Sequence, residues 1–257
     1  MKKKKMKKTG PYIGVTGFMS RDEVLKALEV VPKKSTHRLM AGVLMSSKTL
    51  DGLTNKYPGR YPQRDQIADI LVDDPRALNL VHYNTDKPET LFRQLTKISK
   101  LAGPNLDGFQ LNIAWPSICQ VEDWWENNPD KFLVLQIGRQ AMKQVASLEH
   151  FQNLLGAYVP MVDAILIDAS MGEGRPLIVE DCRKYLQAAS IYSTLGLGAA
   201  GGLGQETLHS FGVLFSEFPG LSPDAQNCLR TPPPEDALHI SAMQGYLKKA
   251  FSIVAKH

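Results

Sequence analysis

The chain has 257 residues, of which 43% are hydrophobic and 22% charged; both values are close to globular averages and argue against a disordered chain. Its formal charge of +4 is misleading, because six lysines fall in the first eight residues and the rest of the chain has 24 basic against 26 acidic residues. A basic nucleic-acid-binding face is therefore not indicated, and no apolar run approaches the roughly 18 residues of a membrane span.

The lysine-rich start is expected to be a disordered tail over residues 1–10. No apolar signal segment follows it, because Thr9-Gly10-Pro11 leads directly into a short β-rich run. Residues 11–257 are expected to form one domain. The three cysteines are odd in number and widely spaced, which argues against a disulfide framework and favours a reducing compartment, by default the cytoplasm.

Short β-rich apolar runs recur along the whole chain, with starts about 30 residues apart. They cover residues 12–17, 38–45, 78–83, 108–113, 132–137, 164–168, 194–200 and 220–225. Helix-like segments lie between them: one begins at Arg21, one at Pro88 and one at Gln205. A last helix is expected over residues 237–255.

Strands that alternate with helices at this period are parallel and joined by right-handed crossovers. Eight such units favour closure into a barrel over an open sheet. Continuous apolar runs such as Ile165-Leu166-Ile167 are typical of strands that are covered on both faces. We therefore predict an α/β fold, a single (β/α)8 or TIM barrel. Its eighth strand is the least regular, because Pro223 is unfavourable in a central strand.

One connection, residues 46–65 after the second strand, is unusually long. Its Pro58-Gly59 and Tyr61-Pro62 pairs favour a structured loop over a helix. Loops that follow strands lie on the catalytic face of such a barrel. This loop is therefore expected to be either a lid or packing over the barrel mouth.

Polar residues at the ends of the strands are the candidates for chemistry, because they face the active site in such barrels. The set suits sugar hydroxyls and proton transfer, and it contains no cluster with metal-ligand spacing, so neither a metal nor a cofactor is expected. Its members are Thr16, Ser46, Ser47, Lys48, His82, Asn84, Gln110, Asn112, Gln136, Asp168, Ser170, Asp224, Gln226 and Asn227.

Asp168 is the sharpest candidate. It ends an apolar strand and precedes a glycine-rich turn with Gly172, Gly174 and Arg175. A partly desolvated carboxylate suits acid catalysis or ligand contact. The alternative is a residue that caps the next turn.

A second glycine-rich segment, residues 196–205, contains Gly201 and Gly202 at the end of the seventh strand. Glycines let backbone N–H groups approach an anion, and the dipole of the next helix would add to this attraction. The loops after strands seven and eight often bind phosphate in this fold. The segment is therefore either a phosphate site or only a tight turn.

Aromatic and sulfur residues give weaker indications. Trp115 is a candidate wall for a planar ligand, whereas Trp124 and Trp125 are expected to pack in a helix. His82 is either a satisfied barrel residue or a participant in the site. Cys119 and Cys182 are expected to be small core residues.

Together these motifs resemble phosphoribosylanthranilate isomerase, a barrel of the ribulose-phosphate-binding superfamily, over about residues 12–250. The resemblance rests on the opening strand and turn at 15–23, on Gln110-Leu111-Asn112, on 165–168 with the turn behind it, and on Ala200-Gly201-Gly202-Leu203. The sequence departs from the family at three positions. Thr16 stands where the family has its catalytic cysteine, Gln136 stands in place of a lysine, and Gln226-Asn227-Cys228 alters the second phosphate loop.

The resemblance implies an Amadori rearrangement of a phosphorylated aminoaldose, with Asp168 as the acid that opens the sugar ring. It also implies ligand contacts at Thr16, Asn112 and Gln136. A threonine hydroxyl is a poor base, so the base is assigned to Asp224, the other carboxylate at a strand end.

Two hypotheses for the function follow. The first is an isomerase-like enzyme that acts on a phosphorylated sugar or aminosugar. The second is a barrel that binds a phosphorylated or sugar-like ligand with no catalysis or with another chemistry. Under either hypothesis the partner is a small ligand rather than a nucleic acid or a membrane, and the oligomeric state stays open.

Overall fold

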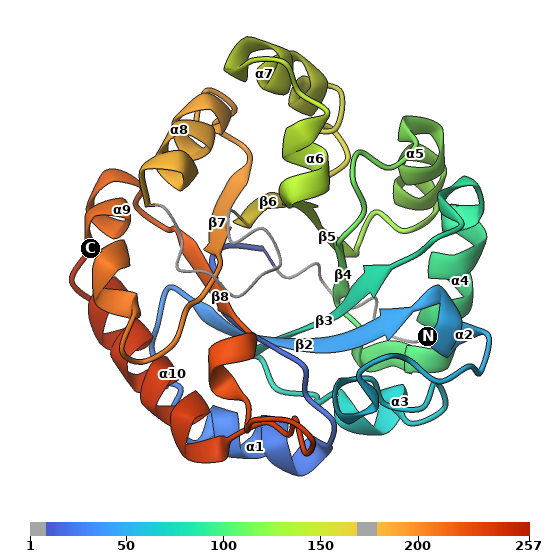
Figure 1. Ribbon diagram of the computed structural model, residues 1–257, viewed down its shortest axis with the longest axis vertical. Coiled ribbons are helices and arrows are strands. Elements are labelled where there is room, and N and C mark those ends of the chain that lie inside the picture. Colours follow the sequence, from blue (N-terminus) through green and yellow to red (C-terminus); the bar gives the residue numbers. More distant parts are fainter. Residues whose placement is uncertain (1–8, 169–178) are drawn as a thin grey trace, which may run out of the picture.

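The computed structural model describes residues 9–168 and 179–257, in which the chain forms a closed barrel of parallel strands in the order β1 to β8. The strands lie at the centre and the helices surround them (Figure 1). This confirms the predicted (β/α)8 barrel. The strands are β1 Tyr12–Thr16, β2 Arg38–Ser46, β3 Ala77–Asn84, β4 Gly108–Leu111, β5 Phe132–Ile137, β6 Ala164–Asp168, β7 Gly196–Ala200 and β8 Ser222–Ala225.

The helices follow the strands in the order that the sequence predicts. They are α1 Arg21–Leu28, α2 Ser47–Leu50, α3 Ile67–Ile70, α4 Leu91–Ala102, α5 Ile118–Asn127, α6 Arg139–Lys143, α7 Leu148–Gly156, α8 Val179–Ala189, α9 Gly212–Glu217 and α10 Ile240–Val254. Short 3-10 turns complete the set: η1 Pro58–Arg60, η2 Pro88–Thr90, η3 Gly103–Asn105, η4 Leu208–Phe211 and η5 Asn227–Leu229.

The start of α1 illustrates how the sequence sets a boundary. The Ser20 side chain accepts a hydrogen bond from the Glu23 backbone N–H, and the Glu23 carboxylate accepts one from the Ser20 backbone N–H. This reciprocal capping box satisfies two donors at the helix N-terminus, so the helix begins at Arg21 as predicted.

The helix expected to begin at Gln205 does not begin there. Residues 205–207 form a turn, and the helical segment starts with η4 at Leu208 and continues as α9. The Thr207 hydroxyl donates to the Gly202 carbonyl at 2.7 Å and accepts from the Gly204 N–H at 2.9 Å. This side chain ties the backbone into a turn where a helix would otherwise start.

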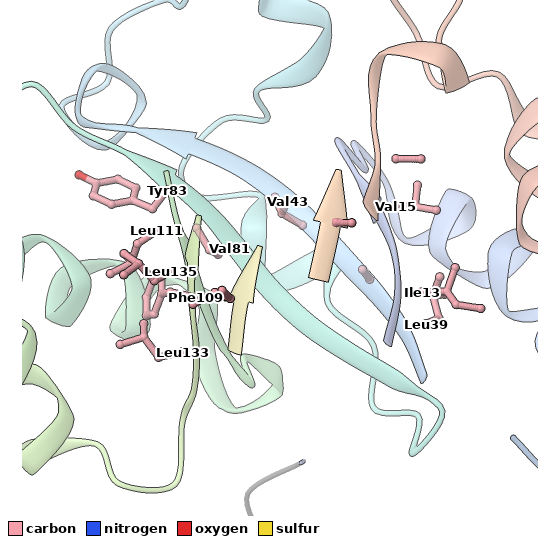
Figure 2. Packing of buried hydrophobic residues seen from close by; sticks show 14 of the residues in the cluster. Ile13, Val15, Leu39, Val43, Val81, Tyr83, Phe109, Leu111, Leu133 and Leu135 are labelled. Carbon is pink, nitrogen blue, oxygen red and sulfur yellow. The ribbon is translucent and has the colours of Figure 1, made fainter. Parts of the chain in front are cut away.

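Two apolar layers form the core, because successive side chains of a strand point to opposite faces. Residues such as Ile13, Val15, Val43 and Phe109 point outward and pack under the helices (Figure 2). A second cluster fills the barrel interior; it consists of Tyr12, Met40, Leu78, Leu80, Phe132, Val134, Ala164, Leu166 and Ala200.

The strand alternation changes character near the carboxyl ends. In β3, β5 and β6 the inward series runs from Leu78 and Leu80 to His82, from Phe132 and Val134 to Gln136, and from Ala164 and Leu166 to Asp168. The barrel is therefore apolar inside and polar at its C-terminal mouth.

Pro223 does lie in a strand, contrary to the ordinary expectation for proline. It pairs with Ala199 of β7, whereas the ladder from β8 to β1 includes only Asp224 and Ala225. The β1 ladder therefore begins just after the proline, which has no N–H to contribute.

The long connection 46–65 is partly helical, since its first residues form α2 and η1 lies further along. The prediction of a loop without helix was wrong for residues 47–50. Ser46 caps this short helix by accepting from the Thr49 N–H, which explains its start.

The cysteines divide by position. Cys182 is buried in α8 as predicted, but Cys119 in α5 is exposed, so its assignment to the core was wrong. The buried face of α5 presents Val121 and Trp124 instead. The predicted tail lies almost wholly outside the described residues.

Candidate functional site

A cavity opens at the C-terminal mouth of the barrel. Most of its lining consists of polar side chains that end strands, together with the loops after β7 and β8. The lining residues are Thr16, His82, Gln110, Gln136, Leu166, Asp168, Ala200, Gly201, Gly202, Leu203, Asp224, Gln226 and Asn227. This cavity brings together ten of the predicted candidates: Thr16, His82, Gln110, Gln136, Asp168, Gly201, Gly202, Asp224, Gln226 and Asn227.

Asp224 points inward from β8 and is 5% exposed. The Thr16 hydroxyl donates to its carboxylate, at 3.2 Å to Oδ1 and 3.4 Å to Oδ2. Glycines make room for this pair. A Cβ at Gly14 would lie 2.7 Å from the Asp224 carboxyl carbon, and a Cβ at Gly42 would lie 2.7 Å from the Thr16 hydroxyl. The small residues of β1 and β2 therefore admit the carboxylate into the barrel.

Burial raises the pKa of Asp224 from 3.8 to about 7. The low-dielectric interior disfavours the charged form, and this effect outweighs the polar side chains of Gln110 and Thr16, which stabilise the carboxylate and lower the pKa. The charge of Asp168 raises the pKa further. Asp224 can therefore take up or release a proton near neutral pH.

Asp168, at the end of β6, lines the same cavity and joins a chain of hydrogen bonds. Gln136 Nε2 donates to Asp168 Oδ2 at 3.0 Å, and Gln110 Nε2 donates to Gln136 Oε1 at 3.1 Å. Gln110 Nε2 also lies 3.0 Å from His82 Nδ1. Four neighbouring strands, β3 to β6, thus hold a connected polar row.

His82 is buried, and desolvation lowers its pKa from 6.5 to about 4. Its imidazole is therefore neutral near pH 7. The sequence left its role open, and the structure places it in the cavity lining, hydrogen-bonded to Gln110.

The glycine segment after β7 contributes backbone to the cavity. Gly201 has φ of 122° and Gly202 has φ of 62°, conformations that L side chains rarely adopt. Because neither residue carries a side chain, a ligand can approach the main chain here. The expected dipole of a following helix is missing, since the next residues form a turn.

A second cavity adjoins the first, and Gln136 and Asp168 line both. Asn112 lies here rather than in the central cavity, beside Arg139 and Lys143. Both basic residues lie in α6, the short helix that follows β5, whereas the strand-end candidates stop at Gln136.

Several predicted residues are not brought to the cavities. Ser46, Ser47, Lys48 and Asn84 line neither of them; Ser47, for example, donates to Asp86 at 2.6 Å. Gly172, Gly174, Arg175 and Ser170 lie outside the described residues.

Trp115 does not line either cavity, so the expectation of a planar-ligand wall was wrong. Its ring nitrogen donates to the Ala141 carbonyl at 2.9 Å, and its ring lies 5.8 Å from Tyr158 and 6.0 Å from Phe151. It joins α6 to α7. Trp124 is buried as predicted, with its ring edge-on to Phe109.

A partly buried ion pair and several hydrogen bonds dock the long connection 46–65 against the segment that follows β8. Arg60 bonds both carboxylate oxygens of Asp236, at 2.5 and 2.9 Å, and donates to Asn227 at 2.6 Å. Arg230, with its side chain 1% exposed, donates to the carbonyls of Gly17 and Gly59. Of the two readings of this loop, packing at the barrel mouth agrees with these contacts.

Within residues 9–168 and 179–257, no group of three histidine, cysteine or acidic side chains could hold a metal ion. No helix in the same part of the chain is long and apolar enough to cross a membrane.

No protein-family model matches the sequence, and no curated protein matches it either. Solved structures do match over nearly the whole chain. The catalytic domain of a hyperthermophilic chitinase from Pyrococcus furiosus has a TM-score of 0.61 at 8% identity, covering 98% of this chain and 98% of that chain.

Tryptophan synthase subunit alpha from Legionella pneumophila str. Paris has a TM-score of 0.59 at 12% identity, covering 99% of this chain and 94% of that chain. Orotidine 5'-monophosphate decarboxylase from Methanocaldococcus jannaschii has a TM-score of 0.52 at 14% identity, covering 95% of this chain and 98% of that chain. At these identities the likeness establishes the barrel fold alone, and the resemblance to phosphoribosylanthranilate isomerase stays a prediction.

Proposed function

We propose that this barrel is an isomerase-like enzyme that moves a proton between neighbouring carbons of a phosphorylated sugar or aminosugar. The observation that carries the proposal is Asp224, a buried carboxylate with a pKa of about 7 in a cavity that a second carboxylate, Asp168, also lines. Proton transfer is most efficient when the pKa of the catalytic group is near the working pH.

The two carboxylates divide the proton transfers. Asp168 gives a proton to the ring oxygen, and the bond between that oxygen and C1 breaks as the amine or hydroxyl on C1 forms a C1=N or C1=O double bond. Asp224 takes the proton from C2; the electrons of that C–H bond form a double bond between C1 and C2, while the π electrons of the C1=N or C1=O bond move to the nitrogen or oxygen. The resulting enol or enolamine then loses its hydroxyl proton and gains a proton at C1, which leaves a ketone at C2.

The position of Asp224 supports its role as the base. Thr16, which stands where the related family has its catalytic cysteine, donates a hydrogen bond to the Asp224 carboxylate. A base at Asp224 therefore acts beside the position where the family reaction needs one. Gln136 donates to Oδ2 of Asp168, which holds this carboxyl group at the cavity wall.

The phosphate is assigned to the glycine segment after β7. Its support is the backbone of Gly201 and Gly202 in the cavity wall, at the loop position that commonly holds phosphate in this fold. The neutral amides of Gln110 and Gln136 in the same cavity suit sugar hydroxyls. The Methanocaldococcus jannaschii neighbour is, by its name, an enzyme for a monophosphate.

Gly201→Val is expected to weaken the binding of ribose 5-phosphate at least tenfold, because the added side chain blocks approach to the backbone. Calorimetric titration of both proteins measures the change. Gly103→Val is the matched control: Gly103 also has positive φ, at 71°, but lies away from the cavity. Equal affinity in the wild-type and Gly201→Val proteins would remove the phosphate site from the proposal.

The reaction is tested by assaying aldose-to-ketose conversion of phosphorylated pentoses and of phosphoribosylanthranilate. Wild type is expected to convert at least one of them, and Thr16→Cys is expected to create or raise phosphoribosylanthranilate isomerase activity by restoring a thiol at that position. Conversion of none of these compounds by either protein would contradict the proposed reaction.

A binding protein without this reaction is the second candidate. One observation favours it: Gln136 stands where the related family has a lysine, and both ends of its amide are already bonded, to Gln110 and Asp168. Binding of ribose 5-phosphate with no conversion of any compound in the panel would support this candidate.

A further inference from the structure

The row of hydrogen bonds from Asp168 to His82 has a definite direction. Gln136 turns its NH2 group toward Asp168, so its carbonyl oxygen faces Gln110. That oxygen can only accept, so Gln110 turns its own NH2 group toward Gln136. Gln110 Nε2 has a second hydrogen, and this nitrogen lies 3.0 Å from Nδ1 of His82.

This direction fixes the tautomer of His82. An amide nitrogen only donates, so His82 Nδ1 must accept and carries no hydrogen. Desolvation lowers the pKa of His82 to about 4, which keeps the ring neutral near pH 7. A neutral imidazole has one N–H, so the hydrogen of His82 is on Nε2. Within residues 9–168 and 179–257, Nε2 bonds to no protein group.

A second group in the same cavity points to a ligand. The Oε1 atom of Gln110 is buried and has no hydrogen-bond partner in the described part of the chain, and the residue is only 1% exposed. A buried acceptor without a partner is unfavourable, because it has lost its hydrogen bonds to water and gained none from the protein. Gln110 and His82 both line the cavity, so a residue with an unsatisfied buried acceptor and a residue with a donor lie together at its wall.

We infer that His82 and Gln110 form a subsite for a ligand oxygen, in which His82 Nε2–H donates to that oxygen and Gln110 Oε1 accepts a ligand hydroxyl hydrogen. This subsite deepens the proposed function and rests on it: it selects a polyhydroxylated ligand, because a hydroxyl both donates and accepts. The neutral imidazole can also donate to oxygen as negative charge develops there in an enolate-like state.

The test is nitrogen-15 NMR of the imidazole rings at pH 7, with His82→Gln used to assign the His82 resonances. Wild type is expected to have the His82 proton on Nε2. In Gln110→Met the new side chain cannot donate to Nδ1, so His82 is expected to lose its preference for the proton on Nε2. His37 is the internal control. It is buried just before β2, at the end of the barrel opposite His82, and its Nε2 lies 3.1 Å from the Leu221 carbonyl.

Ribose 5-phosphate then probes the subsite. Saturation is expected to shift the His82 Nε2–H resonance and leave His37 unchanged, and His82→Gln is expected to bind at least tenfold more weakly than wild type. A wild-type proton on Nδ1, a charged ring at pH 7, or a bound sugar phosphate that leaves His82 unshifted would overturn the subsite. Failure of ribose 5-phosphate to bind wild type would count against the proposed function and the subsite together, whereas a wrong tautomer would overturn the subsite alone.

Discussion

Replacing Asp224 with asparagine is expected to lower turnover of the sugar phosphate about 100-fold or more, the usual scale for loss of a general base. The wild-type kcat/KM is expected to fall as the pH drops below about 7, because a protonated Asp224 cannot take the C2 proton. Steady-state rates from pH 5 to 9 measure both effects.

Asp163→Asn is the matched control for this variant. Asp163 immediately precedes β6, at the opposite end of the barrel from the cavity, where its carboxylate accepts from the Leu133 N–H. Turnover in this control is expected to stay near the wild-type value. A wild-type rate that rises below pH 7 would make Asp224 an acid rather than the base.

Asp224→Asn is also expected to be more stable than wild type above pH 7. The folded protein raises the pKa of Asp224 from 3.8 to about 7, so the folded state holds this proton more tightly than the unfolded state. The resulting contribution to stability is fully present below about pH 4 and is lost as the pH rises through about 7.

Asparagine has no charge to bury, so Asp224→Asn does not lose stability in this way. At about 1.4 kcal/mol per pKa unit, the loss in wild type amounts to at most about 4 kcal/mol of the free energy of unfolding. Thermal unfolding of both proteins at pH 5 and pH 8 measures the difference. It also separates a catalytic defect from misfolding. A variant less stable than wild type at pH 8 would show that the carboxylate is favourably held.

Asp168→Asn is expected to abolish turnover while leaving the affinity for ribose 5-phosphate within a few-fold of wild type. An asparagine oxygen can still accept the hydrogen bond that Gln136 donates to position 168, so the polar row is retained, but the amide cannot deliver a proton. The measurements are kcat by assay and Kd by calorimetry. Full turnover in this variant would remove Asp168 from the acid role.

The barrel could be predicted because each strand has its own local signal. The eight apolar runs and their spacing are local patterns, and the observed strands match them to within two residues at each end. Inward-facing ends follow from the period of two along each strand, so Thr16, Gln136, Asp168 and Asp224 could all be placed at the mouth.

The contacts between these side chains could not be predicted. The hydrogen-bonded row from His82 through Gln110 to Gln136 depends on the register between neighbouring strands, which the sequence of one strand alone does not determine. The pair Arg60–Asp236 joins residues 176 positions apart. The late start of the helix after β7 follows from the side-chain bonds of Thr207, which override the helix-like pattern.

The most direct test of the proton-transfer proposal is the exchange of the C2 hydrogen of phosphorylated pentoses with deuterium from solvent, followed by proton NMR. The proposal predicts that wild type and Asp163→Asn exchange this hydrogen in at least one pentose phosphate well above the buffer rate. The proposal also predicts that the exchange rate of this hydrogen falls by about 100-fold or more in Asp224→Asn. Equal exchange in wild type and Asp224→Asn, or no exchange above buffer by wild type, would contradict the proposal.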